Sequence, residues 1–137
     1  MQYKYRKINL EQFAVLTDGP IEADTEINIR TDIEFAYERE NRLLTSKMTL
    51  TADNNSQTLM KAVMSSFFEI APESINEITD ENGKLFFDPI SLVQFASLNY
   101  GSLRGALYVK MADTSLKDLV IPPVYFHKII TSAFIIE

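Results

Sequence analysis

The chain contains no cysteine, a single histidine and fewer basic than acidic residues. Without cysteine there is no disulfide, no thiol nucleophile and no thiolate metal site. The 13 Lys and Arg residues stand against 19 Asp and Glu residues, which gives a net charge of −6. Nucleic-acid binders need clustered positive charge to neutralise phosphates, so the composition disfavours that class and favours basic partners.

Catalytic motifs are also lacking. The sequence has no Gly-rich phosphate loop, no Gly-x-Ser-x-Gly and no His-Glu-x-x-His. His127 has neither a thiol nor a second imidazole to work with, so a capping or surface role is expected of it. We therefore expect no enzyme, no metal and no cofactor. Carboxylates that lie close together in sequence fall on polar turns, where they are usually solvated: Asp18, Glu22, Asp24, Glu26, Asp80 and Glu81.

Long apolar runs are absent as well. No segment of the sequence approaches the roughly 18 consecutive apolar residues of a membrane-spanning helix. The basic residues 1–7 are not followed by the apolar run of a signal peptide. We therefore expect a cytoplasmic protein. Its 137 residues, 46% of them hydrophobic, predict one domain that covers residues 1–137.

The first half of the chain shows β-strand patterns. Between residues 27 and 37 apolar side chains occupy nearly every odd position, which is typical of a strand with one wet face. The segment 44–52 returns as its hairpin partner, and 8–15 predicts a strand whose phase slips, as at a bulge. The segment 59–70 predicts a fourth strand, and the polar residues 72–87 then form a connection.

A long helix is predicted over residues 89–112. Asp88 suits the N-cap position, and Pro89 suits the first helical position, where its missing N–H costs nothing. At about 100° per residue, the apolar side chains share an arc of roughly 160° that should face the core. They are Leu92, Val93, Phe95, Ala96, Tyr100, Leu103, Ala106, Leu107 and Met111.

The opposite arc of this helix carries small residues where a monomer would carry charges. They are Ser97, Gly101 and Gly105, spaced i, i+4 and i+8. Each glycine inside a helix costs about 1 kcal/mol relative to alanine, and close approach of another backbone would offset that cost. We expect this face to be an oligomer interface with a second copy. The alternative is that another element of the same chain covers it.

After Pro122 and Pro123, apolar residues recur at helical spacing from Phe126 to Phe134, which predicts a short final helix. The expected fold class is therefore α+β. It has a four-stranded antiparallel sheet, with a long helix and a short C-terminal helix packed on one side.

The predicted fourth strand is apolar on both faces. Met60 and Met64 lie on one face and Phe67 on the other, so the strand needs two covers. The long helix and a loop or partner subunit would supply them in one interpretation. The other interpretation is an exposed groove, because flexible Met and Phe side chains suit partners of variable shape.

Three stretches carry a resemblance to a known family. The stretch 62–72, Ala-Val-Met-Ser-Ser-Phe-Phe-Glu-Ile-Ala-Pro, resembles the fourth strand of the SecB export chaperones. The stretches 103–114 and 119–126, which end in Ile-Pro-Pro-Val-Tyr-Phe, resemble that family's main helix and its Leu-x-Leu-Pro-Pro-Val-Asn-Phe segment. The Arg104-Gly105 pair is most similar to divergent SecB-like proteins, including those associated with toxin–antitoxin systems.

The resemblance implies a SecB-like fold and a tetramer built as a dimer of dimers. It also implies hydrophobic grooves that hold unfolded polypeptide without ATP, where several weak linked sites give avidity. By position, Phe126 would line a groove, with Pro123 and Val124 shaping its corner. The strand pattern adds Met60, Met64 and Phe67 to this polypeptide-binding groove.

Two departures from the family bear on the client. Tyr125 stands where the family usually has Asn, and the sequence ends at Glu137 without the tail that export chaperones use to contact the SecA motor. These departures disfavour coupling to secretion, and a holdase for a dedicated client such as an antitoxin is as consistent with the sequence as a general holdase. The alternative function is an oligomeric scaffold with one protein partner, in which residues 72–87 fill the groove. A small-molecule site or an enzyme would need converging polar groups around His127.

Overall fold

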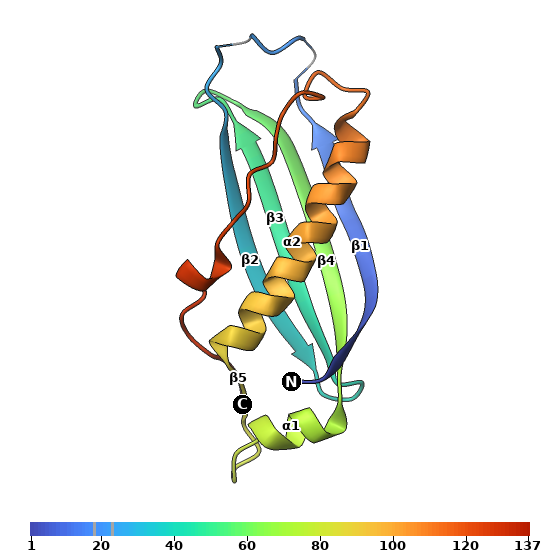
Figure 1. Cartoon of the computed structure of the whole chain (residues 1–137), viewed down its shortest axis with the longest axis vertical. Helices are drawn as coiled ribbons and strands as arrows, with labels where there is room; N and C mark the ends of the chain where they lie inside the picture. Colours follow the sequence, from blue (N-terminus) through green and yellow to red (C-terminus); the bar gives the residue numbers. More distant parts are fainter. Residues whose placement is uncertain (18, 23) are drawn as a thin grey trace.

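The main layer of the molecule is a four-stranded antiparallel sheet in the order β1-β4-β3-β2 (Figure 1). The computed structural model describes residues 1–17, 19–22 and 24–137, so the predicted turn residue Asp18 lies outside the described residues. All four predicted strands are confirmed. They are β1 (Tyr3–Val15), β2 (Asn28–Glu38), β3 (Leu43–Asp53) and β4 (Thr58–Ile70).

Strand β1 is longer than predicted and is irregular. Its register against β4 shifts between Tyr5 and Lys7 and again between Leu10 and Gln12. The second shift lies where the slipped phase of the sequence predicts a bulge. A bulge inserts one extra residue into one strand. The apolar side chains on both sides of the bulge therefore face the same side of the sheet, although their sequence positions change from even to odd.

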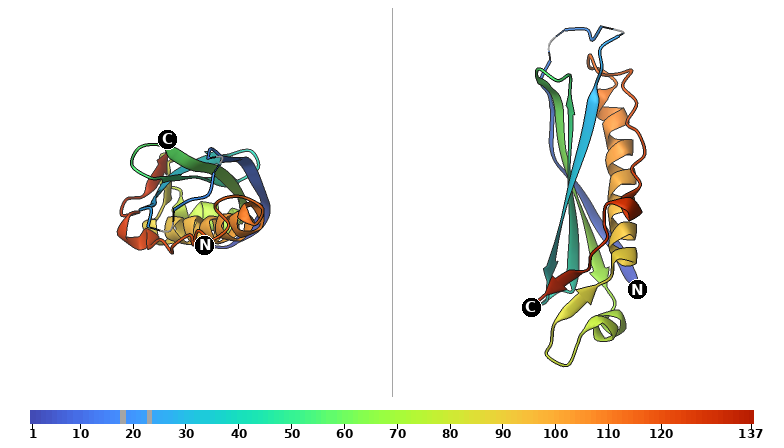
Figure 2. Two further views of the ribbon diagram at one scale, coloured as in Figure 1. Left: turned by 90° about the horizontal axis from the view of Figure 1, so that it is seen from above. Right: turned by 90° about the vertical axis from the view of Figure 1, so that its left-hand side faces the viewer.

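The long helix α2 (Pro89–Met111) lies diagonally across one face of the sheet (Figures 1 and 2). The carboxylate of Asp88 caps it, accepting hydrogen bonds from the backbone N–H of Ser91 at 3.1 Å and its hydroxyl at 2.7 Å. Partial burial opposes ionisation of Asp88, but these bonds outweigh it and hold its pKa below the ordinary value. The apolar arc faces the sheet as predicted, with Phe95, Leu103 and Leu107 completely buried.

A buried polar network fixes the helix on the sheet. Asn99 is completely buried, and its Nδ2 donates to the carbonyl oxygens of Ser46 at 2.9 Å and Met64 at 3.2 Å. Its Oδ1 accepts a hydrogen bond from the Ser66 hydroxyl at 2.6 Å, and the Tyr5 hydroxyl lies 2.6 Å from that same Ser66 oxygen. Buried polar groups are costly when unpaired, so these bonds favour a single position of α2 on β3 and β4.

The connection 72–87 is more ordered than predicted. It contains the helix α1 (Pro72–Ile78) and the strand β5 (Leu85–Phe87), which lie beyond one end of the main sheet (Figure 1). Asp80 organises the turn between them, because its carboxylate accepts hydrogen bonds from the backbone N–H groups of Asn82 and Lys84. A helix of 7 residues and a strand of 3 residues span too few repeats for their periodicity to be recognised.

The predicted final helix from Phe126 to Phe134 is wrong. The chain makes one 3-10 turn, η1 (Phe126–Lys128), and then forms the strand β6 (Phe134–Ile136), which pairs with β5. The β-branched residues at 129–131 fit a helix poorly, and β5 offers the following residues an edge to pair with. We call residues 121–136 the C-terminal strap; it runs back along the helix side of the sheet (Figures 1 and 2).

Candidate polypeptide-binding surface

Side chains one helical turn apart on α2 hold the start of the strap. The Tyr100 hydroxyl donates to the carbonyl oxygen of Pro122 at 2.6 Å, and Arg104 Nε donates to that of Ile121 at 3.1 Å. The Tyr108 hydroxyl accepts a hydrogen bond from the Ile121 N–H at 3.0 Å. Burial raises the pKa of Tyr100 above its ordinary value, although the Arg104 guanidinium opposes this. The Tyr100 phenol therefore stays protonated and able to donate.

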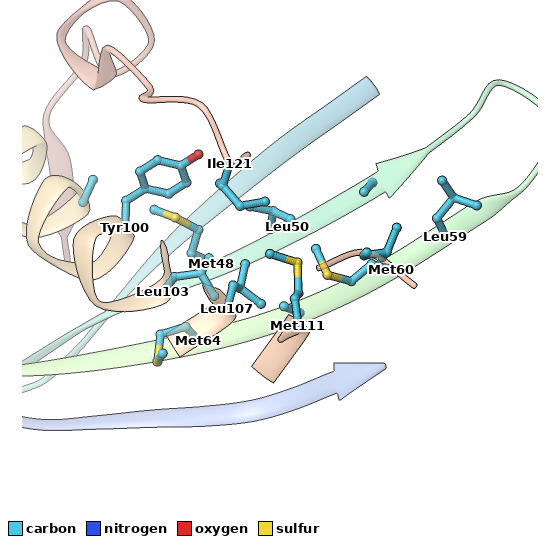
Figure 3. Close-up of a cluster of buried hydrophobic side chains, with 14 of the residues drawn as sticks. Met48, Leu50, Leu59, Met60, Met64, Tyr100, Leu103, Leu107, Met111 and Ile121 are labelled. Carbon is cyan, nitrogen blue, oxygen red and sulfur yellow. The ribbon is translucent and has the colours of Figure 1, made fainter. Parts of the chain in front are cut away.

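Met60, Met64 and Phe126, which were expected to line a groove, are buried in this chain. Their side chains are 0, 1 and 3% exposed and belong to one core cluster with Ile121 of the strap. Figure 3 shows Met60, Met64 and Ile121 in this cluster. The two methionines point to the face beneath α2, and the strap closes that face. Contact between these three residues and a polypeptide stays a prediction, one that requires the strap to move.

Phe67 points to the opposite face of the sheet and is half-buried. Lys7 Nζ lies 5.9 Å from the centre of its ring. The neighbouring Ser65 donates to Glu11 at 2.8 Å, and Lys47 Nζ lies 3.7 Å from the same carboxylate. Long polar side chains of β1 and β3 thus form the second cover that the strand needs. The structure separates Phe67 from the two methionines of β4.

Two grooves border the strap. The upper groove, about 380 Å³ in volume, lies between the segment that precedes β2 and the turn that follows α2. Carboxylates of Glu22 and Asp118 stand beside its apolar side chains, so it suits an apolar segment that carries basic residues. The groove is lined by Ile21, Glu22, Thr25, Ile27, Ser115, Leu116, Asp118, Leu119 and Val120.

The lower groove, about 220 Å³ in volume, lies between the start of α2 and the second half of the strap. Apolar side chains dominate it, and Ile90 at its rim is 82% exposed. Val120 of the upper groove is 71% exposed, and Ile129 of the strap is 60% exposed. The lower groove is lined by Pro89, Ile90, Val93, His127 and Ile130.

The two proline-corner residues of the predicted site lie between these grooves. Pro123 is exposed and Val124 is half-buried, so both are accessible on the surface of the strap. Sequence reasoning missed the groove residues Ile90 and Val120. Ile90 lies outside the apolar arc of α2, which signalled an accessible side chain, whereas loop residues such as Ile21 follow no periodic pattern that could have marked them.

The predicted oligomer face of α2 is open in the single chain. Ser97, Gly101 and Gly105 are all exposed. A Cβ atom added at either glycine would meet no other atom within 4 Å among the described residues. Packing within this chain therefore gives no reason for glycine at positions 101 and 105.

His127 is exposed and lies against apolar neighbours in the lower groove. Within residues 1–17, 19–22 and 24–137, no group of three His, Asp or Glu side chains is arranged to hold a metal ion. In the same ranges no helix is long and apolar enough to cross a membrane.

Comparison with known proteins identifies the fold. No protein-family model and no curated protein sequence matches the chain. Solved structures similar to it include the Mycobacterium tuberculosis SecB-like chaperone Rv1957 in complex with a ChAD peptide from the HigA1 antitoxin Rv1956. That match has a TM-score of 0.56 and 12% sequence identity, and it covers 89% of this chain and 90% of the other. The chain therefore has the SecB-like α+β fold, with α2 packed on a four-stranded antiparallel sheet.

Proposed function

We propose that this chain is an ATP-independent holdase chaperone that binds unfolded or partly folded polypeptide. The observation that carries the proposal is the pair of open grooves beside the strap, one mixed and one apolar, on a fold shared with a chaperone. Exposed apolar surface of this kind is typical of binding sites for other polypeptides. In this proposal residues 1–137 act as one domain in the cytoplasm, without a cofactor or enzymatic activity.

Binding would rest on many weak contacts. An extended client segment can place apolar side chains against Val120 in the upper groove and Ile90 in the lower groove, passing over Pro123 and Val124. The carboxylates of the upper groove would favour basic residues in the client. Each contact is modest, and several linked contacts give useful avidity. Phe67, on the other face of the sheet, would contribute a further accessible contact.

Avidity increases if the chain assembles. We propose that the face formed by Ser97, Gly101 and Gly105 packs against a second copy, giving a dimer or a tetramer. The open space around both glycines supports this, because a facing helix could approach closely there. An assembly would present several pairs of grooves to one unfolded chain.

The solved complex of the similar chaperone contains a peptide from an antitoxin. We therefore propose a dedicated client of this kind first and a role in protein export second. The alternative function, a scaffold with one partner, was expected to fill its groove with residues 72–87. That segment lines neither open groove, but the strap of the same chain covers Met60 and Met64 and buries its own Phe126, so the two functions differ in whether a client displaces the strap.

Suppression of aggregation tests the proposal. A heat-unfolded reporter protein is followed by light scattering in the absence of ATP, with wild type and an Ile90→Ser/Val120→Ser variant. Burying one such side chain is worth about 1.5–3 kcal/mol, so the variant should need at least roughly tenfold more chaperone. Ile8→Ser is the matched control, because Ile8 is 52% exposed on β1 and lies in neither groove.

Two results would count against the proposal. If the wild type does nothing at several-fold excess, the general chaperone is excluded and the search turns to one dedicated partner. If wild type and the groove variant suppress aggregation equally, these two grooves are not the client site.

A further inference from the structure

We propose that the edge of β5 is a second polypeptide-binding site, which β6 occupies in this structure and vacates when a client strand replaces it. The peptide it takes is extended, with an aromatic residue, any residue, an aliphatic residue and then an acidic residue. This inference deepens the proposed function and rests on it, because the incoming strand is part of the client.

The chain's own strand shows what the site recognises. Strand β6 pairs with β5 in antiparallel register, Phe134 opposite Phe87 and Ile136 opposite Leu85. The Phe134 ring lies 6.1 Å from that of Phe87 and 6.2 Å from that of Phe35 on β2, measured between ring centres. Phe134 and Ile136 are half-buried, and Ile135 between them is exposed. The site thus contacts every second side chain of the strand, as expected when a strand is added to a sheet edge.

Basic groups receive the residue that follows the strand. Arg39 Nη2 donates to the carbonyl oxygens of Glu137 at 2.8 Å and Gly83 at 3.2 Å. Lys84 Nζ lies 3.3 Å from the carboxylate of Glu137. An acidic residue at the end of an incoming strand could take the same position, which sets the direction and the register of the peptide.

The bound strand is held weakly enough to exchange. The β5–β6 sheet contains only three residue pairs in the described chain, and two-stranded sheets of this size are marginally stable in water. The Lys84 and Glu137 side chains are 42% and 80% exposed, and solvent-exposed ion pairs contribute little. In the described residues, the backbone hydrogen bonds of the turn that precedes β6 stay inside the strap, from Lys128 to Tyr125 and from Ile129 and Ile130 to Phe126.

Opening this end of the strap leaves the main fold in place. The other end stays attached to α2 through Tyr100, Arg104 and Tyr108. Release of β6 uncovers the aromatic side chains of Phe35 and Phe87 and the free backbone edge of β5. A peptide strand that pairs there restores both the hydrogen bonds and the apolar cover.

A reversible lock tests the inference. Phe86 and Ile135 face each other across the two strands and are 38% and 46% exposed, so Phe86→Cys/Ile135→Cys can join them by a disulfide. The natural sequence has no cysteine, so this disulfide has no competitor. The oxidised and reduced forms of one protein are the matched pair, and mass spectrometry confirms the bond.

The probe is a fluorescent synthetic peptide with the sequence of residues 130–137, and a peptide with serine in place of Phe134 is the control. Wild type and the reduced variant should bind the probe at least tenfold more tightly than the oxidised variant or the control peptide. Phe134→Ser in the full-length chain, which weakens the packing of the resident strand and leaves β5 unchanged, should raise the probe's affinity. That variant decides the matter if the disulfide forms incompletely.

Three outcomes overturn the inference. They are equal binding to the oxidised and reduced forms, no binding to any form, and a doubling of mass on reduction that would assign the β5 edge to a second copy. Aggregation suppression is measured on the same samples. If suppression persists while the probe fails to bind, the strand-exchange site is wrong and the proposed chaperone function stands.

Discussion

The hydroxyl of Tyr108 satisfies both backbone groups of Ile121: it accepts a hydrogen bond from the N–H at 3.0 Å and lies 3.4 Å from the carbonyl oxygen, to which it donates. Ile121 is completely buried, so without this hydroxyl its N–H would have no hydrogen-bond acceptor, because water does not reach it. Tyr108 thus acts together with Tyr100 and Arg104 to anchor the start of the strap on α2.

Tyr108→Phe removes this anchor without removing the ring. We expect the free energy of unfolding to fall by about 1–3 kcal/mol, because a buried N–H loses its acceptor. Urea unfolding measures the loss, and hydrogen exchange at the Ile121 amide should accelerate. Tyr125→Phe is the control, since Tyr125 is 60% exposed on the strap. An unchanged exchange rate at Ile121 would show that the Tyr108 hydroxyl does not hold the strap.

The capping carboxylate gives a pH dependence. Because the pKa of Asp88 in the folded chain lies below its ordinary value, the stability it contributes is complete above about pH 3.9. That contribution is lost as the pH falls through the lowered value. Asp88→Ala should cost about 1 kcal/mol at neutral pH, as expected for loss of an N-cap. Urea titrations at pH 7 and pH 3 measure both effects, and equal losses at the two pH values would contradict this assignment.

Asn99→Ala should be among the most damaging single substitutions in the helix. It removes the donor to the carbonyl oxygens of Ser46 and Met64 and the acceptor of the Ser66 hydroxyl, which keeps only Tyr5 as a partner. We expect a loss of about 2–4 kcal/mol from unpaired polar groups and a small cavity. Ser97→Ala, on the exposed face of the same helix, should change stability by less than about 0.5 kcal/mol. Equal effects of the two substitutions would rule out a structural role for the network.

The substitution Gly101→Leu tests the oligomer interface separately from the stability of the single chain. A Cβ atom at position 101 meets no other element within 4 Å among the described residues, and leucine favours a helix by nearly 1 kcal/mol over glycine. The monomer should therefore remain folded, while a closely packed second helix should be displaced. Light scattering is expected to show a lower mass for this variant than for wild type. If the mass does not change, the small-residue face is not the interface. Gln94→Leu, at an exposed position of the same helix, is the control for added apolar surface.

The sequence predicted the elements whose signals are local and repeated. Strand β2 shows its alternation over eleven residues, and α2 is marked by Asp88 and Pro89 at its start. The strand β6 was missed because its partner, β5, is distant in sequence. The apolar residues from Phe126 to Phe134 do have helical spacing, but the end of this segment pairs with β5 as a strand instead of forming a helix.

The candidate site was harder to predict for a similar reason. Periodicity identifies which side chains are buried, and Met60, Met64 and Phe126 are among them. It does not say whether the same chain or a client covers them. That depends on the path of the strap after two prolines, which no repeat encodes. Ile90 and Val120 became candidates only when the grooves on either side of that path were known.

The Asn99 network also bears on how freely this protein can diverge. The amide sets the position of α2 by direction-specific bonds to backbone groups, which every sequence possesses. The apolar residues around it then need only conserve volume, and four methionines among them adapt their shape readily: Met48, Met60, Met64 and Met111. Core side chains can therefore be exchanged for others of similar volume while the helix keeps its place on the sheet.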